Sequence, residues 1–153
     1  GIVPENTPDP GLQPVLSLKA RVARVSVVEA GEGVSYGLAW RAPVDSLVAL
    51  VPVGYADGWR RSLGNRGKVL ISGRECPIVG RVCMDQFMVN VTGMSVAEGD
   101  EVVLIGEQGA GSQPVEAIAE LTGTIAWEIL AGLGARLPRL YHRAGMVEMI
   151  DRL

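Results

Sequence analysis

The first strong pattern in the chain is an alternation of apolar and polar residues between Pro14 and Ala30. From residue 16 to 22 the apolar side chains occupy even positions, whereas from 23 to 27 they occupy odd positions. Successive side chains of a strand point to opposite faces, so the pattern predicts a long strand whose inward face changes. We expect either a β-bulge near Val22–Arg24 or a strand that crosses between sheets.

Shorter apolar runs, rich in valine and isoleucine and bounded by glycine or charged residues, predict the other strands. The tetrad Ser72-Gly73-Arg74-Glu75 separates two of them and is typical of a hairpin turn. The predicted strands cover residues 47–53, 68–71, 76–79, 86–91, 101–105, 139–141 and 146–150.

Helical periodicity comes late in the chain. Apolar residues recur with the 3.6-residue period from Pro114 to Leu121, and Ser112 lies close to the expected cap. Thr124 is the expected cap of a second helix, which runs through Leu130 and ends before Gly132 and Gly134. We therefore predict a mainly β fold: an antiparallel, barrel-like domain of about eight strands with two short helices near the C-terminus.

The first residues follow a different pattern. Three of the first ten residues are proline, and proline forbids a helix interior, so residues 1–13 read as an extended linker. Because the chain also starts without methionine, we expect it to be cut from a longer protein, with residues 14–153 as its folded domain.

Composition excludes several classes of protein. The 153 residues can bury a core, and 48% hydrophobic with 20% charged residues excludes intrinsic disorder. A net charge of −3 argues against nucleic-acid binding, and no apolar run reaches the roughly 20 residues of a membrane span. The two cysteines lack metal-site or redox-pair spacing, which favours reduced thiols inside a cell. With one histidine and two lysines, any catalysis must rely on tyrosine, arginine, aspartate and backbone groups.

Three glycine-flanked segments carry polar side chains at predicted strand ends: Val34–Gly37, Gly54–Arg61 and Gly80–Gln86. Each has an ordinary structural interpretation. A tyrosine is most often a half-buried packing residue whose hydroxyl reaches solvent or a carbonyl group. An aspartate before glycine is most often a turn residue, and a methionine most often belongs to the core. Taken singly, the segments indicate only a β domain of unknown function.

Taken together and in this order, the motifs VSYG, VPVGYADGWRRSL and CPIVGRVCMDQFMVNVT resemble the C-terminal β domain of the alanine racemases. The tail TIAWEILAGLGARLPRLY resembles the last helix and strand of the same family. The resemblance extends from Pro14 to Tyr141.

The resemblance implies a two-domain isomerase dependent on pyridoxal 5′-phosphate, in which residues 1–13 link this domain to a missing N-terminal (β/α)8 barrel. That barrel holds the cofactor as a lysine Schiff base. It further implies a homodimer in which each active site receives the β domain of the neighbouring chain. The reaction interconverts L- and D-alanine for peptidoglycan synthesis in the bacterial cytoplasm.

Racemisation removes a proton from one face of the α-carbon and delivers one to the other, which two opposed bases can do. The resemblance assigns one base to the barrel lysine and the other to Tyr36. A free tyrosine has a pKa of about 10, so we expect positive groups of the partner's barrel to help it act as a base.

The other motif positions carry over as substrate-facing residues. Met84 matches the residue whose backbone N–H receives the substrate carboxylate, and Asp85 lies next to it. Tyr55 matches a tyrosine that narrows the access to the site. Arg61 and Arg81 match arginines of the access corridor, where positive charge attracts the substrate.

One position departs from the family. Trp127 stands where a tyrosine commonly binds the cofactor phosphate, and tryptophan keeps an N–H donor but loses the hydroxyl. Neither Lys19 nor Lys68 matches a family motif, so we expect the chain alone to bind the cofactor poorly and to be inactive. Two alternatives stay open: a serine or broad-specificity racemase, and a non-catalytic dimerisation or binding module.

Overall fold

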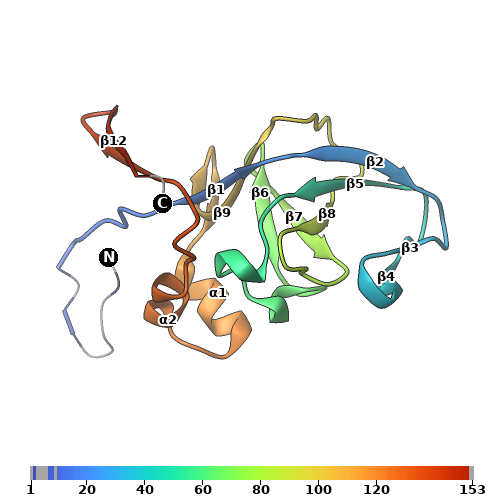
Figure 1. Cartoon of the computed structure of the whole chain (residues 1–153), viewed down its shortest axis with the longest axis horizontal. Coiled ribbons are helices and arrows are strands. Elements are labelled where there is room, and N and C mark those ends of the chain that lie inside the picture. The colour runs from blue at the N-terminus through green and yellow to red at the C-terminus, as the bar shows by residue number, and fades with distance from the viewer. Residues whose placement is uncertain (1, 3–6, 9, 152–153) are drawn as a thin grey trace.

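The structure is a computed structural model that describes residues 2, 7–8 and 10–151. Its main element is an eight-stranded antiparallel sheet, and two short α-helices lie on one side of it (Figure 1). The mainly β prediction is therefore confirmed. The order along the sheet is β1 (Leu18–Arg21), β9 (Glu101–Gln108), β6 (Lys68–Ile71), β7 (Arg74–Val79), β8 (Phe87–Asn90), β5 (Ser46–Val51) and β2 (Arg24–Val28), and β10 (Gly111–Gln113) pairs with β9.

The two ends of the sheet, β1 and β2, are consecutive in the chain. The side chains that pack on the main core change from even positions up to Val22 to the odd position of Val25, which confirms the predicted change of face, but Val27 is 68% exposed and the inward position predicted for it is wrong. At the junction the Val22 N–H donates to the Asp100 carbonyl and the Ala23 N–H to the Leu50 carbonyl, both at 2.9 Å. One bent strand therefore pairs with β9 through its first half and with β5 through its second half. The sheet curls so that its ends meet in this strand, which gives the barrel-like form.

Both helices occur near the predicted positions, but their caps differ from the prediction. Helix α1 (Val115–Thr122) starts after Pro114, and α2 (Ala126–Ala131) starts after Ile125. Ser112 pairs with Glu107 in the β10–β9 ladder, so its predicted capping role is wrong. Thr124 lies one residue before the cap of α2, and its hydroxyl donates to the Glu128 carboxylate instead.

The main core lies between the curled sheet and the two helices. Val69, Ile71 and Leu104 from the strands and Ile118 and Ile129 from the helices are each at most 1% exposed. A smaller cluster, which includes Val48 and Val79, lies under the short ladder of β3 (Gly33–Val34) and β4 (Trp40–Arg41). The curled sheet thus provides a rigid base for the loops at its strand ends.

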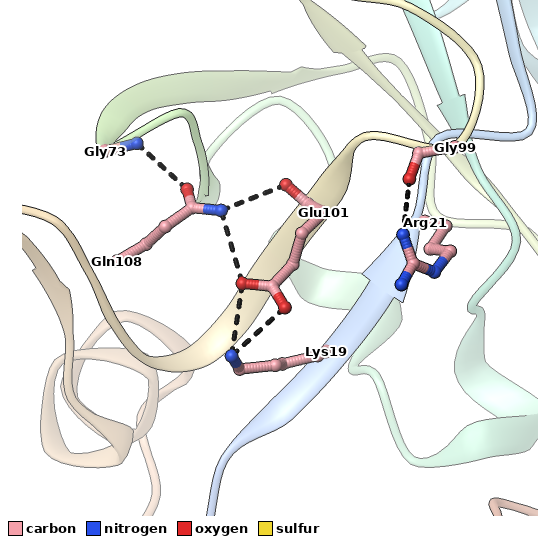
Figure 2. A network of polar contacts seen from close by, with 6 residues as sticks. All are labelled: Lys19, Arg21, Gly73, Gly99, Glu101 and Gln108. Carbon is pink, nitrogen blue, oxygen red and sulfur yellow. Dashed lines mark hydrogen bonds and ion pairs between the residues drawn. The ribbon is translucent and has the colours of Figure 1, made fainter.

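A polar network fastens the outside of the sheet (Figure 2). Gln108 accepts a hydrogen bond from the Gly73 N–H at 2.9 Å and donates to the Glu101 carbonyl at 3.1 Å. The Glu101 carboxylate in turn pairs with Lys19 at 3.1 Å. The network links β1, β9 and the β6–β7 turn, and that turn confirms the predicted hairpin.

The last two strands stand apart from the main sheet. β11 (Arg139–Arg143) and β12 (Met146–Asp151) pair only with each other as a two-stranded sheet, and Figure 1 shows them projecting away from the barrel. Within the described part of the chain, no helix is long and apolar enough to cross a membrane. The structure describes residues 2, 7–8 and 10–13 of the predicted linker 1–13, and none of these residues belongs to a helix or strand. The role of this segment as a linker stays a prediction.

Candidate functional site

The three motif segments come together around one loop. On one side, the Ser35 hydroxyl accepts a hydrogen bond from the Arg81 N–H at 2.9 Å and donates to the Arg81 carbonyl at 3.0 Å. On the other side, the Tyr55 and Ala56 N–H groups donate to the Cys83 and Met84 carbonyls, both at 3.0 Å. Loop 80–86 is therefore held between the segment of Tyr36 and the segment of Tyr55.

Tyr36 lies on the surface of this assembly. It begins a short 3-10 turn, η1 (Tyr36–Leu38), and is 74% exposed. Among the described residues its hydroxyl has no hydrogen-bond partner. Next to it is an open hollow of about 410 Å³, whose other lining residues are Ser35, Gly37, Arg81, Cys83, Gln86, Phe87 and Met88. The Tyr36 phenol is therefore accessible to a molecule that approaches from outside the domain.

Gly80 allows the close contact between the Tyr36 segment and loop 80–86. A Cβ atom at Gly80 would lie 2.5 Å from the Ser35 Cβ, and the backbone φ of Gly80 is +77°. Asn65 holds the same region, because its Oδ1 accepts from the Gly80 N–H at 2.5 Å and its Nδ2 donates to the Ala39 carbonyl at 2.8 Å. The motif glycine thus places the hydroxyl-bearing turn against loop 80–86.

Met84 and Asp85 form the tip of that loop, since the Cys83 N–H donates to the Gln86 carbonyl at 2.8 Å and closes the turn behind them. The Met84 side chain is 53% exposed, and its backbone N–H donates to no group in the described part of the chain. Gly54 packs directly on this tip, where a Cβ atom would lie 2.2 Å from the Met84 carbonyl oxygen. The tip therefore presents a free backbone donor on a well-supported turn.

Arg136 is the residue of this site that the sequence did not reveal. Its Nε donates to Asp57 and its terminal NH2 to Asp85, both at 2.6 Å. The hydrogen bond from the guanidinium to Asp57, and to a smaller extent the one to Asp85, raises the pKa of Arg136 above its ordinary value. The guanidinium therefore stays charged. Arg136 follows α2 in a segment that read only as a connection between helix and strand.

Asp57 has a larger role than that of a turn residue. It is 5% exposed, and its second carboxylate oxygen accepts a hydrogen bond from the Gly54 N–H at 2.8 Å. It belongs to the 3-10 turn η2 (Tyr55–Asp57), and the next 3-10 turn is η3 (Arg61–Leu63). A buried carboxylate needs a cationic partner. Arg60 and Arg61 are close to Asp57 in sequence, but the ion pair of Asp57 is with Arg136, and Arg60 pairs with Glu128.

The predicted corridor arginines differ in their positions. Arg81 lines the hollow beside Tyr36, and its guanidinium has no ion-pair partner among the residues described here. Arg61 starts η3, is exposed, and does not line the hollow. Both cysteines are free, and Cys83 lines the hollow while Cys76 is buried.

Trp127 is not part of this cluster. It is 49% exposed on α2, and α2 lies far along the molecule from the β3–β4 segment that carries Tyr36 (Figure 1). The structure therefore does not bring Trp127 and Tyr36 of one chain to the same pocket.

No group of histidine, cysteine and acidic residues that could hold a metal ion occurs among the described residues. Neither lysine lies in the hollow: Lys19 pairs with Glu101 on the outside of the sheet, and Lys68 pairs with Glu75 at 2.5 Å. The site can therefore offer a phenol, a backbone donor and an arginine to a ligand, but no amine.

Comparison with known proteins identifies the domain. Residues 15–141 match the family model for the alanine racemase C-terminal domain. Alanine racemase from Mycobacterium tuberculosis strain H37Rv is 50% identical over 138 residues, which are 89% of this chain and 36% of that protein. Alanine racemase from Halothermothrix orenii is 50% identical over 131 residues, 85% of this chain and 35% of the relative.

Solved structures agree with the sequence relatives. Alanine racemase from Bacillus anthracis with bound L-Ala-P superposes with a TM-score of 0.89 at 41% identity, covering 92% of this chain and 36% of that one. The enzyme from Streptomyces coelicolor gives a TM-score of 0.81 at 43% identity, covering 86% and 34%. The chain thus spans little more than a third of the proteins it matches, and it belongs to the alanine racemase family as a C-terminal domain.

Proposed function

We propose that this domain is part of an alanine racemase that interconverts L- and D-alanine, and that it supplies Tyr36 to the reaction. The observation that carries the proposal is the convergence of three motif segments that leaves the Tyr36 phenol exposed beside the Met84 loop. A phenol that must reach the α-carbon of a substrate outside its own domain has to be accessible in this way.

Tyr36 would hold or release a proton at one face of the substrate α-carbon. The opposite face needs a second base, and Lys19 and Lys68 are unsuited because each pairs with a surface glutamate away from the hollow. The second base must therefore come from another part of the full-length protein. We assign it to a lysine of an N-terminal barrel, in the partner chain of a homodimer.

The substrate carboxylate would bind at the tip of loop 80–86. The Met84 N–H is a free donor there, and a backbone donor on a fixed turn needs little reorganisation when it binds an anion. Arg81, and farther out Arg61, would attract the carboxylate toward the site. Tyr55, 43% exposed beside Met84, would narrow the access to it, and Asp85 completes the same tip.

Pyridoxal 5′-phosphate is the cofactor that we expect for the full-length protein; when bound, it withdraws the negative charge left on the α-carbon. The residues of this chain fit the substrate-facing side of such a site and not its covalent anchor, because no lysine lies in the hollow. We propose the indole N–H of Trp127 as a contact for the cofactor phosphate. Its separation from Tyr36 supports a dimer in which the two residues of one chain serve different pockets.

In the cell, the proposed enzyme would act in the bacterial cytoplasm and provide D-alanine for peptidoglycan. The same domain could also serve a racemase for serine or for several amino acids, or could only bind or dimerise. The alanine racemases that it matches at 50% identity favour the first assignment.

The test is a racemisation assay of the full-length protein, reconstituted with pyridoxal 5′-phosphate, on L-alanine, D-alanine and L-serine. We expect alanine to be the preferred substrate. Tyr36→Phe should lower racemisation in both directions by about 10²–10⁴-fold, because one of the two bases is lost. In deuterium oxide the same variant should still exchange the α-proton of D-alanine but not that of L-alanine.

Tyr141→Phe is the matched control, since it removes an exposed phenol from β11 that does not line the hollow. It should retain full activity. Absence of any racemisation by the wild-type protein would support the non-catalytic alternative. Preference for serine would support the serine or broad-specificity racemase. Unchanged L-alanine turnover by Tyr36→Phe would show that Tyr36 is not the base.

A further inference from the structure

One guanidinium connects the two loops that form the tip of the site. The Arg136 Nε is 2.6 Å from the Asp57 carboxylate, and its terminal NH2 is 2.6 Å from that of Asp85. The two aspartates precede Arg136 by 79 and 51 residues. Arg136 therefore joins three segments that are distant in sequence.

The bond to Asp57 reaches the Met84 loop through a short series of contacts. Asp57 is buried and accepts the Gly54 N–H, and its own carbonyl accepts the Gly134 N–H at 2.8 Å. From the same turn, the Ala56 N–H donates to the Met84 carbonyl. The neighbouring Tyr55 N–H donates to the Cys83 carbonyl, and that carbonyl and the Met84 N–H belong to the same peptide unit. Arg136 thus supports the turn that orients the Met84 donor.

The bond to Asp85 has an electrostatic consequence. Asp85 follows Met84 directly, and its side chain is 60% exposed, so its carboxylate belongs to the same loop tip as the Met84 N–H to which a substrate carboxylate would bind. The negative charges of Asp85 and of the substrate carboxylate would repel each other there. The Arg136 guanidinium, which stays charged, neutralises Asp85 at this point.

We propose that Arg136 is a positioning residue for the substrate carboxylate: it fixes the Met84 turn through Asp57 and cancels the charge of Asp85. This inference rests on the proposed racemase function. Lysine cannot replace arginine here, since a single ammonium lacks the planar fork that reaches two carboxylates at once.

The experiment measures kcat and KM of the full-length, cofactor-loaded enzyme for L-alanine. Arg136→Lys keeps a cation beside the buried Asp57 and so preserves the fold, but it releases Asp85. We expect KM to rise about tenfold, which equals about 1.4 kcal/mol of binding, with kcat nearly unchanged. Added salt should lower this KM again, because it screens the repulsion from the released carboxylate.

The decisive variant is Asp85→Asn in the Arg136→Lys background. Removing the released charge should return KM toward the wild-type value, a rescue that a merely structural role of Arg136 would not produce. Arg24→Met is the control, because Arg24 is exposed on β2 and its side chain has no ion pair among the described residues. It should leave both constants unchanged.

A wild-type KM in Arg136→Lys would overturn the inference. So would a KM that Asp85→Asn does not lower, or a joint fall of kcat, thermal midpoint and cofactor absorbance. In all these cases wild-type racemisation persists and the proposed function stands. An inactive wild-type protein would instead overturn both.

Discussion

Ser35 has a backbone conformation, φ 67° and ψ 173°, that residues with side chains rarely adopt. Such strain persists only where the surroundings enforce it, and here the Ser35 hydroxyl is bonded to both the N–H and the carbonyl of Arg81. The residue that follows is Tyr36. The direction of the phenol therefore depends on a strained residue and on the two hydrogen bonds that offset the strain.

Ser35→Ala should be more harmful than Ser35→Gly. Alanine keeps the strained φ and loses both hydrogen bonds, so we expect a loss of about 1–3 kcal/mol in the free energy of unfolding. Glycine also loses the bonds but adopts positive φ without strain, and should cost less. Urea unfolding of the domain measures both. Equal losses would show that the backbone strain at Ser35 has no energetic weight.

At this scale the sequence revealed residues with local signals and missed those defined by distant contacts. The tyrosine, the Met84 turn and the corridor arginines stand in glycine-flanked motifs, and the structure brings Tyr36, Met84 and Arg81 to one loop cluster. Arg136 has no such motif, and its partner Asp57 lies 79 residues away. No periodicity in the chain could predict that pairing.

At the scale of elements, hydrophobic periodicity predicted strand and helix positions well because burial determines both. The β1–β2 strand is the best example: its change of phase at Val22 is the point where it passes from β9 to β5. Ser112 shows where such local signals fail. Its side chain favours a helix cap, but in the structure the residue pairs with β9 in the β10–β9 ladder. The two-residue strands β3 and β4 are too short to give any period.

The Gln108 network predicts a measurable contribution to the stability of the sheet. Gln108→Ala removes the acceptor of the Gly73 N–H and the donor to the Glu101 carbonyl, and so removes the side-chain link between the β6–β7 turn and β9 (Figure 2). We expect the free energy of unfolding to fall by about 1–3 kcal/mol. Glu107→Ala, at the exposed neighbouring position, is the control and should change it by less than about 0.5 kcal/mol. Similar losses in the free energy of unfolding for the two variants would show that the Gln108 network does not stabilise the sheet.

At the scale of the whole molecule, the domain forms a core of its own, and no lysine lines the hollow beside Tyr36. The main cluster is formed by the strands and helices of this domain. The hollow is lined by the Tyr36 phenol and Arg81, the neighbouring loop tip carries the free Met84 N–H, and both lysines pair with glutamates elsewhere. The sequence could not show that α2, which carries Trp127, lies far along the molecule from the β3–β4 segment that carries Tyr36 (Figure 1).

The β11–β12 hairpin gives the domain an exposed apolar surface. Leu140, Met146, Met149 and Ile150 are each at least half exposed, although a two-stranded sheet is marginally stable in water on its own. Contiguous exposed apolar groups favour association. The domain without the rest of its protein should therefore self-associate through this hairpin as its concentration rises.

Leu140 and Ile150 face each other across the hairpin, so the double variant Leu140→Glu and Ile150→Lys replaces an apolar pair by an ion pair and preserves strand pairing. Sedimentation velocity over a range of concentrations should then show a shift toward the monomer. The thermal midpoint should stay near the wild-type value, because the hairpin lies outside the core. Val27→Lys, at an equally exposed apolar position on β2, should not change the association. If it dissociates the domain as well, or if the double variant does not, the contact surface lies elsewhere on the barrel.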